Sequence, residues 1–269
     1  LANGWYSYGN PNEPSTNDDP VSKLTINGGT FNGGLNTVKN DDAGEMAING
    51  GTITGFAQSC VQNNNVLIIT GGNIVGEENN TDAAIVSRAV TGSTVNKGIT
   101  KITGGTVKGG NPCIREDISY GSNHKTEISG GTFSSDVTKY LMEGLVQNAN
   151  GTIVEKTYIA SIGDKGFDSL TAAINAANNG DTITLNLSTS EDIVIPKDKA
   201  LTIDILEGVT LTNNKDHTII NNGNLTISDD TILGSNALIS GKGIVITNKT
   251  DIIKYIDTYN GNYTLNNIT

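Results

Sequence analysis

The amino-acid sequence predicts an all-β protein, a right-handed parallel β-helix with three short strands per coil, in two consecutive segments. Three observations support this prediction: a composition poor in core residues, a recurring Gly-Gly phrase, and apolar residues that recur with it. The chain has 269 residues, of which 33 are glycine and 35 asparagine, and 35% are hydrophobic. Globular domains are nearer half apolar, whereas disordered chains carry more charge than the 17% found here. The composition therefore favours short strands joined by polar turns.

A Gly-Gly pair recurs within one phrase five times in the first half of the chain. The phrases are LTINGGTF (24–31), MAINGGTI (46–53), LIITGGNI (67–74), TKITGGTV (100–107) and TEISGGTF (126–133). The pairs begin at residues 28, 50, 71, 104 and 130, so the intervals are 22, 21, 33 and 26 residues. A repeat of about 20 residues indicates a solenoid whose longer intervals carry loop insertions. Glycine adopts positive φ without a steric penalty, so each pair predicts a sharp corner.

Apolar residues keep three fixed positions relative to these corners. The three columns are Ile26, Ile48, Ile69, Ile102 and Ile128; Phe31, Ile53, Ile74, Val107 and Phe133; and Val38, Val61, Ile85 and Ile114. Their alternation with polar residues indicates strands with one buried face. Equivalent strands of successive coils are expected to pair in parallel, about 4.8 Å apart. The Leu and Asn spacing of leucine-rich repeats is absent, and glycine is not every third residue as in collagen.

The pattern divides the chain into a first β-helix at 1–156 and a second at 157–269. The first segment is expected to end with a short helical turn at 136–142 and a link at 148–156. The second is expected because alternating strands resume at 181–187, 192–196, 201–205, 209–212, 217–221, 224–228 and 243–247. Further coils are expected beyond residue 269, because no polar cap closes the sequence.

One amphipathic helix is predicted at about 168–179, at the start of the second segment. Asp168 or Ser169 can act as its N-cap, and Leu170, Ala173, Ile174 and Ala177 follow the i, i+3, i+4, i+7 spacing. The helix is expected to cover the open edge of the second stack, where unpaired backbone otherwise invites aggregation.

Several phrases of the chain resemble a known family. INGGTF, LNTVKNDD, ITGGTV and ISGGTFSSDVTKYL, followed by GFDSLTAAINAANNGDTITL and NNGNLTISDDTIL, are similar to the repeat-rich surface proteins of gut-dwelling Firmicutes. The resemblance covers most of residues 20–250. Those proteins resemble pectate lyases in fold and are described as adhesin-like, with no agreed activity. The resemblance implies a β-helix, and it transfers no catalytic residue.

Charge and hydropathy restrict the partners and the location. The formal net charge of −11 and the pI near 4.5 argue against electrostatic binding of nucleic acid or anionic lipid. No apolar run approaches the roughly 20 residues that span a bilayer, so no membrane insertion is expected. The chain opens on LANGWYSYG without a leader. We therefore expect a mature or trimmed piece of a longer, multidomain bacterial protein, secreted or at the cell surface.

The two cysteines are predicted to be free thiols. Cys60 and Cys113 hold the same strand position with one coil between them, which places their Cα atoms about 9.6 Å apart. A disulfide requires less than about 7 Å between these atoms.

The third column of strands carries the candidate binding face. Aligning NTVKNDD with PCIRED places Lys39 with Arg115 and Asp41 with Asp117. Charged and amide side chains gather there, so a binding face is predicted, although a solvated structural face has the same pattern. The candidate binding residues are Lys39, Asp41, Asp42, Gln62, Asn64, Arg88, Arg115, Glu116 and Asp117. No catalytic residue, metal ligand or cofactor is predicted.

Two enzyme classes that use this fold lack their motifs. Glycosidases similar to polygalacturonase need paired carboxylates and a Gly-His-Gly, but the two histidines lie in NHK and DHT. A lyase needs Ca²⁺ and an arginine base. The Asp41 and Asp117 clusters stand three coils apart, about 14 Å, whereas Ca²⁺ holds its oxygens within about 2.6 Å.

Asparagine and aromatic clusters have structural interpretations. The residues Asn63, Asn64, Asn65, Asn79, Asn80, Asn213, Asn214, Asn221 and Asn222 are expected to stack at corners in left-handed conformations, although amides also bind sugars. Trp5, Tyr6 and Tyr8 are expected to plug the first coil, although aromatic faces also stack on sugar rings.

The leading hypothesis is a non-catalytic, rod-like module of an exported surface protein, an adhesin or stalk that binds a host or dietary glycan or a host surface protein. The alternatives are a polysaccharide lyase or glycoside hydrolase on the same scaffold, and a pure spacer without a ligand.

Overall fold

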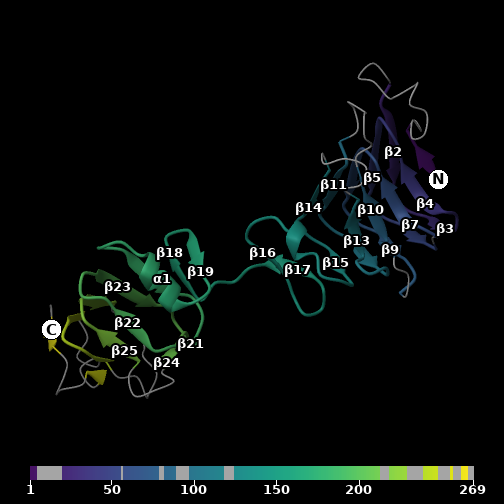
Figure 1. The fold of residues 1–269 in the computed structure, drawn as a ribbon. Helices are drawn as coiled ribbons and strands as arrows, with labels where there is room; N and C mark the ends of the chain where they lie inside the picture. Colours follow the sequence, from purple (N-terminus) through teal and green to yellow (C-terminus); the bar gives the residue numbers. More distant parts are fainter. Residues whose placement is uncertain are drawn as a thin grey trace. The chain divides into compact units, whose positions relative to one another are not determined.

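A computed structural model shows the predicted all-β architecture, with one α-helix among the residues that it describes (Figure 1). The structure describes residues 1–4, 20–55, 57–78, 82–88, 97–117, 124–212, 218–228, 239–247, 255–256 and 262–265. The chain forms two compact units, Leu1–Lys156 and Thr157–Thr269. Each unit contains parallel sheets wrapped around its own apolar interior, so the prediction of two consecutive β-helical segments is confirmed.

The described residues of the first unit form three parallel sheets of five strands each, followed by a two-stranded antiparallel sheet. The first sheet contains β2 (Ser22–Ile26), β5 (Gly44–Ile48), β8 (Val66–Ile69), β11 (Ile99–Ile102) and β14 (Lys125–Ile128). The second contains β3 (Thr30–Asn32), β6 (Thr52–Thr54), β9 (Asn73–Val75), β12 (Thr106–Lys108) and β15 (Thr132–Phe133). The third contains β1 (Ala2–Asn3), β4 (Asn36–Asn40), β7 (Ser59–Asn63), β10 (Ile85–Ser87) and β13 (Ile114–Glu116). Each coil contributes one strand to each sheet.

The strand register confirms the three predicted apolar columns. Ile48 pairs with Ile26 and Ile69, and Val61 pairs with Val38 and Ile85. The column residues are buried in one continuous core, apart from the partly buried Phe31 at the first coil. Because every second residue of a strand points inward, each sheet contributes a single layer of side chains to the core.

The two glycines of each pair serve different purposes. The second glycine has positive φ, as at Gly51 (94°) and Gly105 (89°), and makes the predicted corner. The first glycine lies against the backbone of the preceding coil: a Cβ at Gly104 would stand 2.4 Å from the carbonyl oxygen of Thr70. A side chain at the first position would therefore force two coils apart, whereas one at the second would strain the corner.

A ladder of buried asparagines connects the coils inside the first unit. The Asn3 amide donates to Asn40 Oδ1, and the Asn40 amide donates to Asn63 Oδ1, both at 2.8 Å. The Asn63 amide donates onward to the Ile99 carbonyl (2.9 Å) and the Thr100 hydroxyl (3.0 Å). We call Asn3, Asn40 and Asn63 the asparagine ladder. Each amide satisfies backbone and side-chain groups that are shielded from water.

The expectation of left-handed asparagines at corners is wrong for the described residues. Among them, Ala43 is the one non-glycine residue with positive φ (55°). Asn63 and Asn221 instead extend inward from strands, and Asn221 donates to the Ile244 carbonyl at 3.0 Å in the second unit. Asn79, Asn80, Asn213, Asn214 and the aromatic cluster of Trp5, Tyr6 and Tyr8 lie outside the described residues.

The last coil of the first unit is closed by a short helix and a hairpin. The 3₁₀ helix Thr138–Tyr140 lies within the predicted helical turn. The expectation of a link at 148–156 is wrong, because β16 (Leu145–Gln147) and β17 (Ile153–Glu155) form an antiparallel pair. The hairpin covers the edge of β15: the Phe133 N–H donates to the Gly151 carbonyl, and the Ile153 N–H donates to the Gly131 carbonyl, both at 2.9 Å. The segment that was expected to be a link thus pairs with the edge strand β15 and covers its backbone groups.

The second unit contains a seven-stranded sheet and two smaller parallel sheets. The large sheet has the order β19 (Lys165–Phe167), β18 (Ala160–Ile162), β20 (Thr182–Leu185), β23 (Ala200–Ile205), β26 (Asn224–Ile227), β28 (Ile244–Thr247) and β29 (Asn262–Leu265). The smaller sheets are β21 (Thr189–Ser190) with β24 (Leu211–Thr212), and β22 (Ile193–Ile195), β25 (Ile219–Asn221) and β27 (Ile239–Ser240). Strands occur in all seven predicted ranges.

A helix and a hairpin share the capping of the second unit. Helix α1 (Leu170–Ala176) is shorter than the predicted 168–179, and its Leu170, Ala173 and Ile174 are buried in the core as expected. The helix caps the second unit as predicted, packing against β18, β19, β20 and β22, while the edge of β20 itself pairs antiparallel with β18. The helix closes the apolar interior, and the β18–β19 hairpin satisfies the edge backbone.

The N-terminus of α1 is capped from two directions. The Ser169 hydroxyl accepts a hydrogen bond from the Ala172 N–H at 3.0 Å, so Ser169 is the N-cap. The Glu191 carboxylate accepts the N–H groups of Leu170 (3.0 Å) and Thr171 (3.1 Å). Burial raises the Glu191 pKa, but these bonds and two hydroxyl hydrogen bonds outweigh it, so the pKa lies below its ordinary value.

Replacing Glu191 by glutamine is expected to destabilise the second unit by about 1–2 kcal/mol at pH 7, because charge-assisted hydrogen bonds at the helix N-terminus are lost. A lowered carboxyl pKa stabilises the folded state above the ordinary value of about 4.3. This stabilisation disappears as the pH falls through the folded-state pKa, so the variant and the wild type should differ less at pH 3 than at pH 7. Urea unfolding followed by circular dichroism at both pH values measures the difference. The exposed Glu207→Gln is the control, and an equal loss at both pH values would contradict the assignment.

Cys60 and Cys113 are both buried free thiols, as predicted. They flank Ala84 across β7, β10 and β13, because Ile85 pairs with Val61 and with Ile114. Burial raises the pKa of the Cys60 thiol to about 12. No helix in the described part of the chain is both long and apolar enough to cross a membrane.

Candidate functional site

Strand alternation brings the candidate residues to the outer surface of the sheet of β4, β7, β10 and β13. Lys39, Gln62, Val86 and Arg115 share one register column, as the sequence predicts. Each follows an inward apolar residue and therefore points outward. Lys39 and Arg115 are separated by two intervening strands, which confirms the predicted spacing of three coils.

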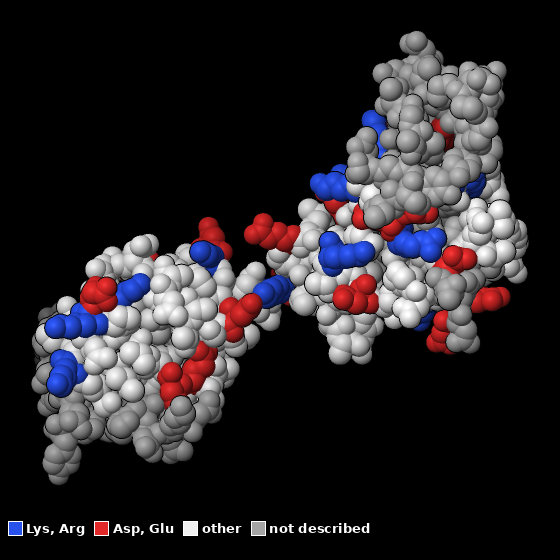
Figure 2. Space-filling model, viewed as in Figure 1, with Lys and Arg blue, Asp and Glu red and all other residues white. Residues whose placement is uncertain are grey.

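Four of the nine candidate residues line one polar pocket of about 230 Å³: Gln62, Arg88, Arg115 and Asp117. We call this hollow the arginine pocket. Its other lining residues are Asn36, Gln58, Ser59, Asp82 and Val86. Lys and Arg side chains alternate with Asp and Glu over the visible surface of the first unit (Figure 2). The pocket itself combines two guanidinium groups with two carboxylates, so its formal charge is balanced.

The Arg88 guanidinium begins a chain of polar contacts that runs behind the pocket. Arg88 Nε donates to Asn64 Oδ1 at 2.9 Å, and the Asn64 amide donates to Asp41 Oδ1 at 2.9 Å. Asp41 in turn forms an ion pair with Lys39 at 2.8 Å. The Gln62 amide also faces Arg88. A guanidinium group only donates hydrogen bonds, so the amide oxygen is the atom that accepts, at 3.3 Å from Arg88 Nε. These contacts hold Arg88 in place at the pocket wall.

Asp41 is a buried carboxylate whose side chain is 6% exposed. Burial raises its pKa above the ordinary value, and Lys39, Arg88 and Asn64 oppose this shift. Asp41 thus holds the Lys39 ammonium group directly, and the Arg88 guanidinium group through Asn64, from a position below the protein surface.

Arg115 lies at the other side of the pocket. Its guanidinium is 3.6 Å from Asp82, and its side chain is 40% exposed. The Arg115 Nε atom is buried and has no hydrogen-bond acceptor in the described ranges. Buried donors without an acceptor are rare in native proteins.

The structure separates the other five candidates from the pocket. Glu116 occupies the inward register of the asparagine ladder, where it accepts the Thr126 N–H at 2.8 Å and lies 3.4 Å from His124 Nε2. Asp42 is 1% exposed. Lys39, Asp41 and Asn64 form the chain of contacts behind the pocket. The prediction that all nine share one face is therefore wrong for Glu116 and Asp42, because alternation turns Glu116 inward and the corner buries Asp42.

Sequence reasoning missed five lining residues. Asn36 and Ser59 occupy equivalent positions in β4 and β7, and the Ser59 hydroxyl donates to Asn36 Oδ1 at 2.5 Å. Both residues precede the inward valine of their strand at the same position of the repeat, so an alignment of the repeats could have identified them. Asp82 lies in a loop outside the repeat, so no periodic signal identifies it.

The chemistry of the pocket favours hydrogen bonding over metal binding. It offers guanidinium donors, amide donors and acceptors, and carboxylate acceptors within one shallow hollow. Over the residues that the structure describes, no group of three or more His, Cys, Asp or Glu side chains converges on a point where it can hold a metal ion. The chain matches no protein-family model, no curated protein and no solved structure.

Proposed function

We propose that the chain is a non-catalytic module of an exported bacterial surface protein that binds glycans at the arginine pocket. The observation that carries the proposal is the balanced set of donors and acceptors that line one solvent-facing hollow. A sugar presents hydroxyl groups that both donate and accept. A pocket whose charges cancel suits such a ligand better than a pocket with a strong negative or positive charge.

The parallel coils also favour binding of an extended ligand. Equivalent side chains of successive coils repeat at about 4.8 Å, so a polymer that lies along the sheet meets a new set of polar groups at each coil. Weak contacts spread over several coils add up to useful avidity. The resemblance to adhesin-like surface proteins supports the same interpretation.

The carboxylates around the pocket already have partners, which supports a binding role. Asp82 pairs with Arg115, and Asp41 pairs with Lys39 and accepts from Asn64. A general acid or base must instead reach the reacting group of a substrate.

Replacing Arg115 by alanine is expected to weaken glycan binding about tenfold or more, because a guanidinium donor to the ligand is lost. A glycan array identifies the ligand, and calorimetry on the purified chain measures the affinity. Lys101→Ala is the matched control, because Lys101 is a similarly exposed cation paired with Glu127 on a different sheet.

Two results would overturn the proposal. Absence of binding to every glycan on the array would leave the spacer hypothesis. An increase in absorbance on polygalacturonate that Arg115→Ala abolishes would show a lyase, because cleavage by elimination creates an unsaturated product.

A further inference from the structure

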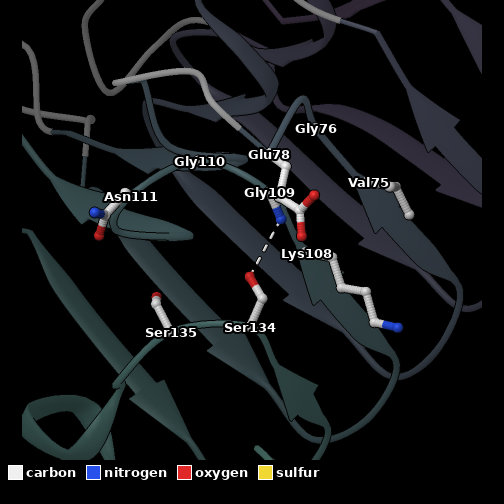
Figure 3. Close-up of a pocket in the computed structure, with 9 residues that line it drawn as sticks. All are labelled: Val75, Gly76, Glu78, Lys108, Gly109, Gly110, Asn111, Ser134 and Ser135. Carbon is white, nitrogen blue, oxygen red and sulfur yellow. Dashed lines mark hydrogen bonds between the residues drawn. The ribbon is translucent and has the colours of Figure 1, made fainter.

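A second hollow lies where the coils turn from β9, β12 and β15 towards the next sheet (Figure 3). Its volume is about 490 Å³, within the range of about 300–1,000 Å³ of small-ligand sites. Gly109 and Gly110 form part of its lining, and both have positive φ. A Cβ at Gly109 would stand 2.2 Å from the Gly76 carbonyl oxygen, and one at Gly110 would stand 2.3 Å from that of Asp82. Close packing of the coils therefore excludes side chains at these two lining positions.

Two serine hydroxyls line this hollow with unused donors. Ser134 Oγ accepts the Gly109 N–H at 3.2 Å (Figure 3). Ser135 Oγ accepts the Cys113 N–H at 2.9 Å. A hydroxyl that accepts from the backbone still has its own proton to donate. Neither proton has an acceptor among the described residues, and the Asn111 amide of the same hollow has no partner there either.

A further hollow of about 430 Å³ adjoins the first one, because Ser134 and Ser135 line both. This further hollow reaches the hairpin that closes the first unit and is lined there by polar groups such as Thr138, Asn148 and Asn150. We call the two adjoining hollows the serine groove. It passes from the third coil to the end of the stack, so it suits a linear ligand of several units.

We infer that the serine groove binds a segment of a neutral polysaccharide. Its hydroxyls, amides and backbone groups match the hydroxyl groups of sugars. Lys108 and Glu78 offset one another in the first hollow, so no cationic cluster selects an anion. Phe133, the aromatic lining residue, is 3% exposed, so an apolar ligand finds little surface to cover.

This inference is independent of the proposed function at the arginine pocket. The two sites have no lining residue in common, and they lie on different sheets or corners of the coil. Each can therefore be removed without the other.

The test is calorimetric titration of the purified 269-residue chain with cellotetraose, xylotetraose and mannotetraose at pH 7, with tetragalacturonate as the charged comparison. We expect at least one neutral tetrasaccharide to bind, and Asn111→Ala and Ser135→Ala each to weaken that binding about tenfold. Asn111→Ala removes an amide that has no partner among the described residues, so its thermal unfolding should match the wild type. Asn32→Ala, an exposed amide of β3 at the far end of the same sheet, is the matched control and should bind normally.

Three results would overturn the inference: none of the three neutral tetrasaccharides binds, tetragalacturonate alone binds, or Asn111→Ala binds like the wild type. Arg115→Ala separates the two sites. If it leaves neutral-sugar binding intact while Asn111→Ala reduces it, the serine groove binds the sugar whether or not the arginine pocket has a ligand.

Discussion

Replacing Gly104 by alanine is expected to destabilise the first unit by about 3 kcal/mol or more. The new Cβ would stand 2.4 Å from the Thr70 carbonyl oxygen. The new Cβ is attached to the backbone of one coil and meets a backbone atom of the neighbouring coil, so no flexible side chain can move aside. Overpacking in a well-packed interior costs about 1–3 kcal/mol, and here the strain also separates hydrogen-bonded strands. Urea unfolding followed by circular dichroism measures the loss.

Gly28→Ala is the matched control for this prediction. Gly28 holds the same position in the first coil, where a Cβ would meet no atom within 4 Å. Neither Gly28 nor Gly104 has positive φ, so backbone strain does not distinguish them. Alanine at Gly28 should be neutral or stabilise by up to about 1 kcal/mol, because it restricts the unfolded chain. Similar losses for both variants would show that contact between coils is not the cause.

Replacing Asn63 by alanine is expected to destabilise the first unit by at least about 3 kcal/mol. The Asn40 amide, the Ile99 carbonyl and the Thr100 hydroxyl would each lose a hydrogen bond. Asn63 is fully buried, so water cannot replace these bonds without rearrangement. Each buried polar group that is left unpaired costs about 1–3 kcal/mol. The same unfolding measurement applies.

Asn49→Ala separates the effect of burial from the effect of stacking. Asn49 also forms a ladder between coils, donating to Asn27 at 2.8 Å and accepting from the Thr70 hydroxyl at 2.9 Å. This second ladder is exposed at the glycine corner, so water replaces the lost bonds and the cost should be within about 0.5 kcal/mol. Equal losses at Asn49 and Asn63 would contradict the argument that shielding from water makes the asparagine ladder important.

The asparagine ladder also connects stability with the candidate site. Asn63 lies between Gln62, which lines the arginine pocket, and Asn64, which holds Arg88. Strand alternation turns Asn63 inward and its two neighbours outward or to the corner. The inward amide fixes the backbone from which the site residues project.

Periodic features of the fold were predictable because they depend on local geometry. Alternation determines which residues of a strand face inward, so the columns of Ile48 and Val61 follow from the sequence. The same register correctly separates Cys60 from Cys113. The spacing of Leu170, Ala173 and Ile174 likewise predicts one buried helix face, and Ser169 is a favoured N-cap.

Contacts outside the repeat were not predictable. Asp82 reaches Arg115 from a loop, and Glu191 caps a helix that begins 21 residues earlier. Antiparallel pairing of β18 with β20 covers an edge that was assigned to the helix. Such contacts depend on where loops and hairpins come to lie, and no residue periodicity encodes that position.

The sequence alone therefore determined the stacked coils, their apolar columns, the glycine corners and the column from which the site residues project. The tertiary structure decided that the asparagines form an internal ladder, that the corner buries Asp42, and that the arginine pocket and the serine groove exist. The physical reason is that alternation specifies the side of a strand on which a residue lies. The shape of a hollow and the partner of a long side chain depend on packing between segments distant in sequence.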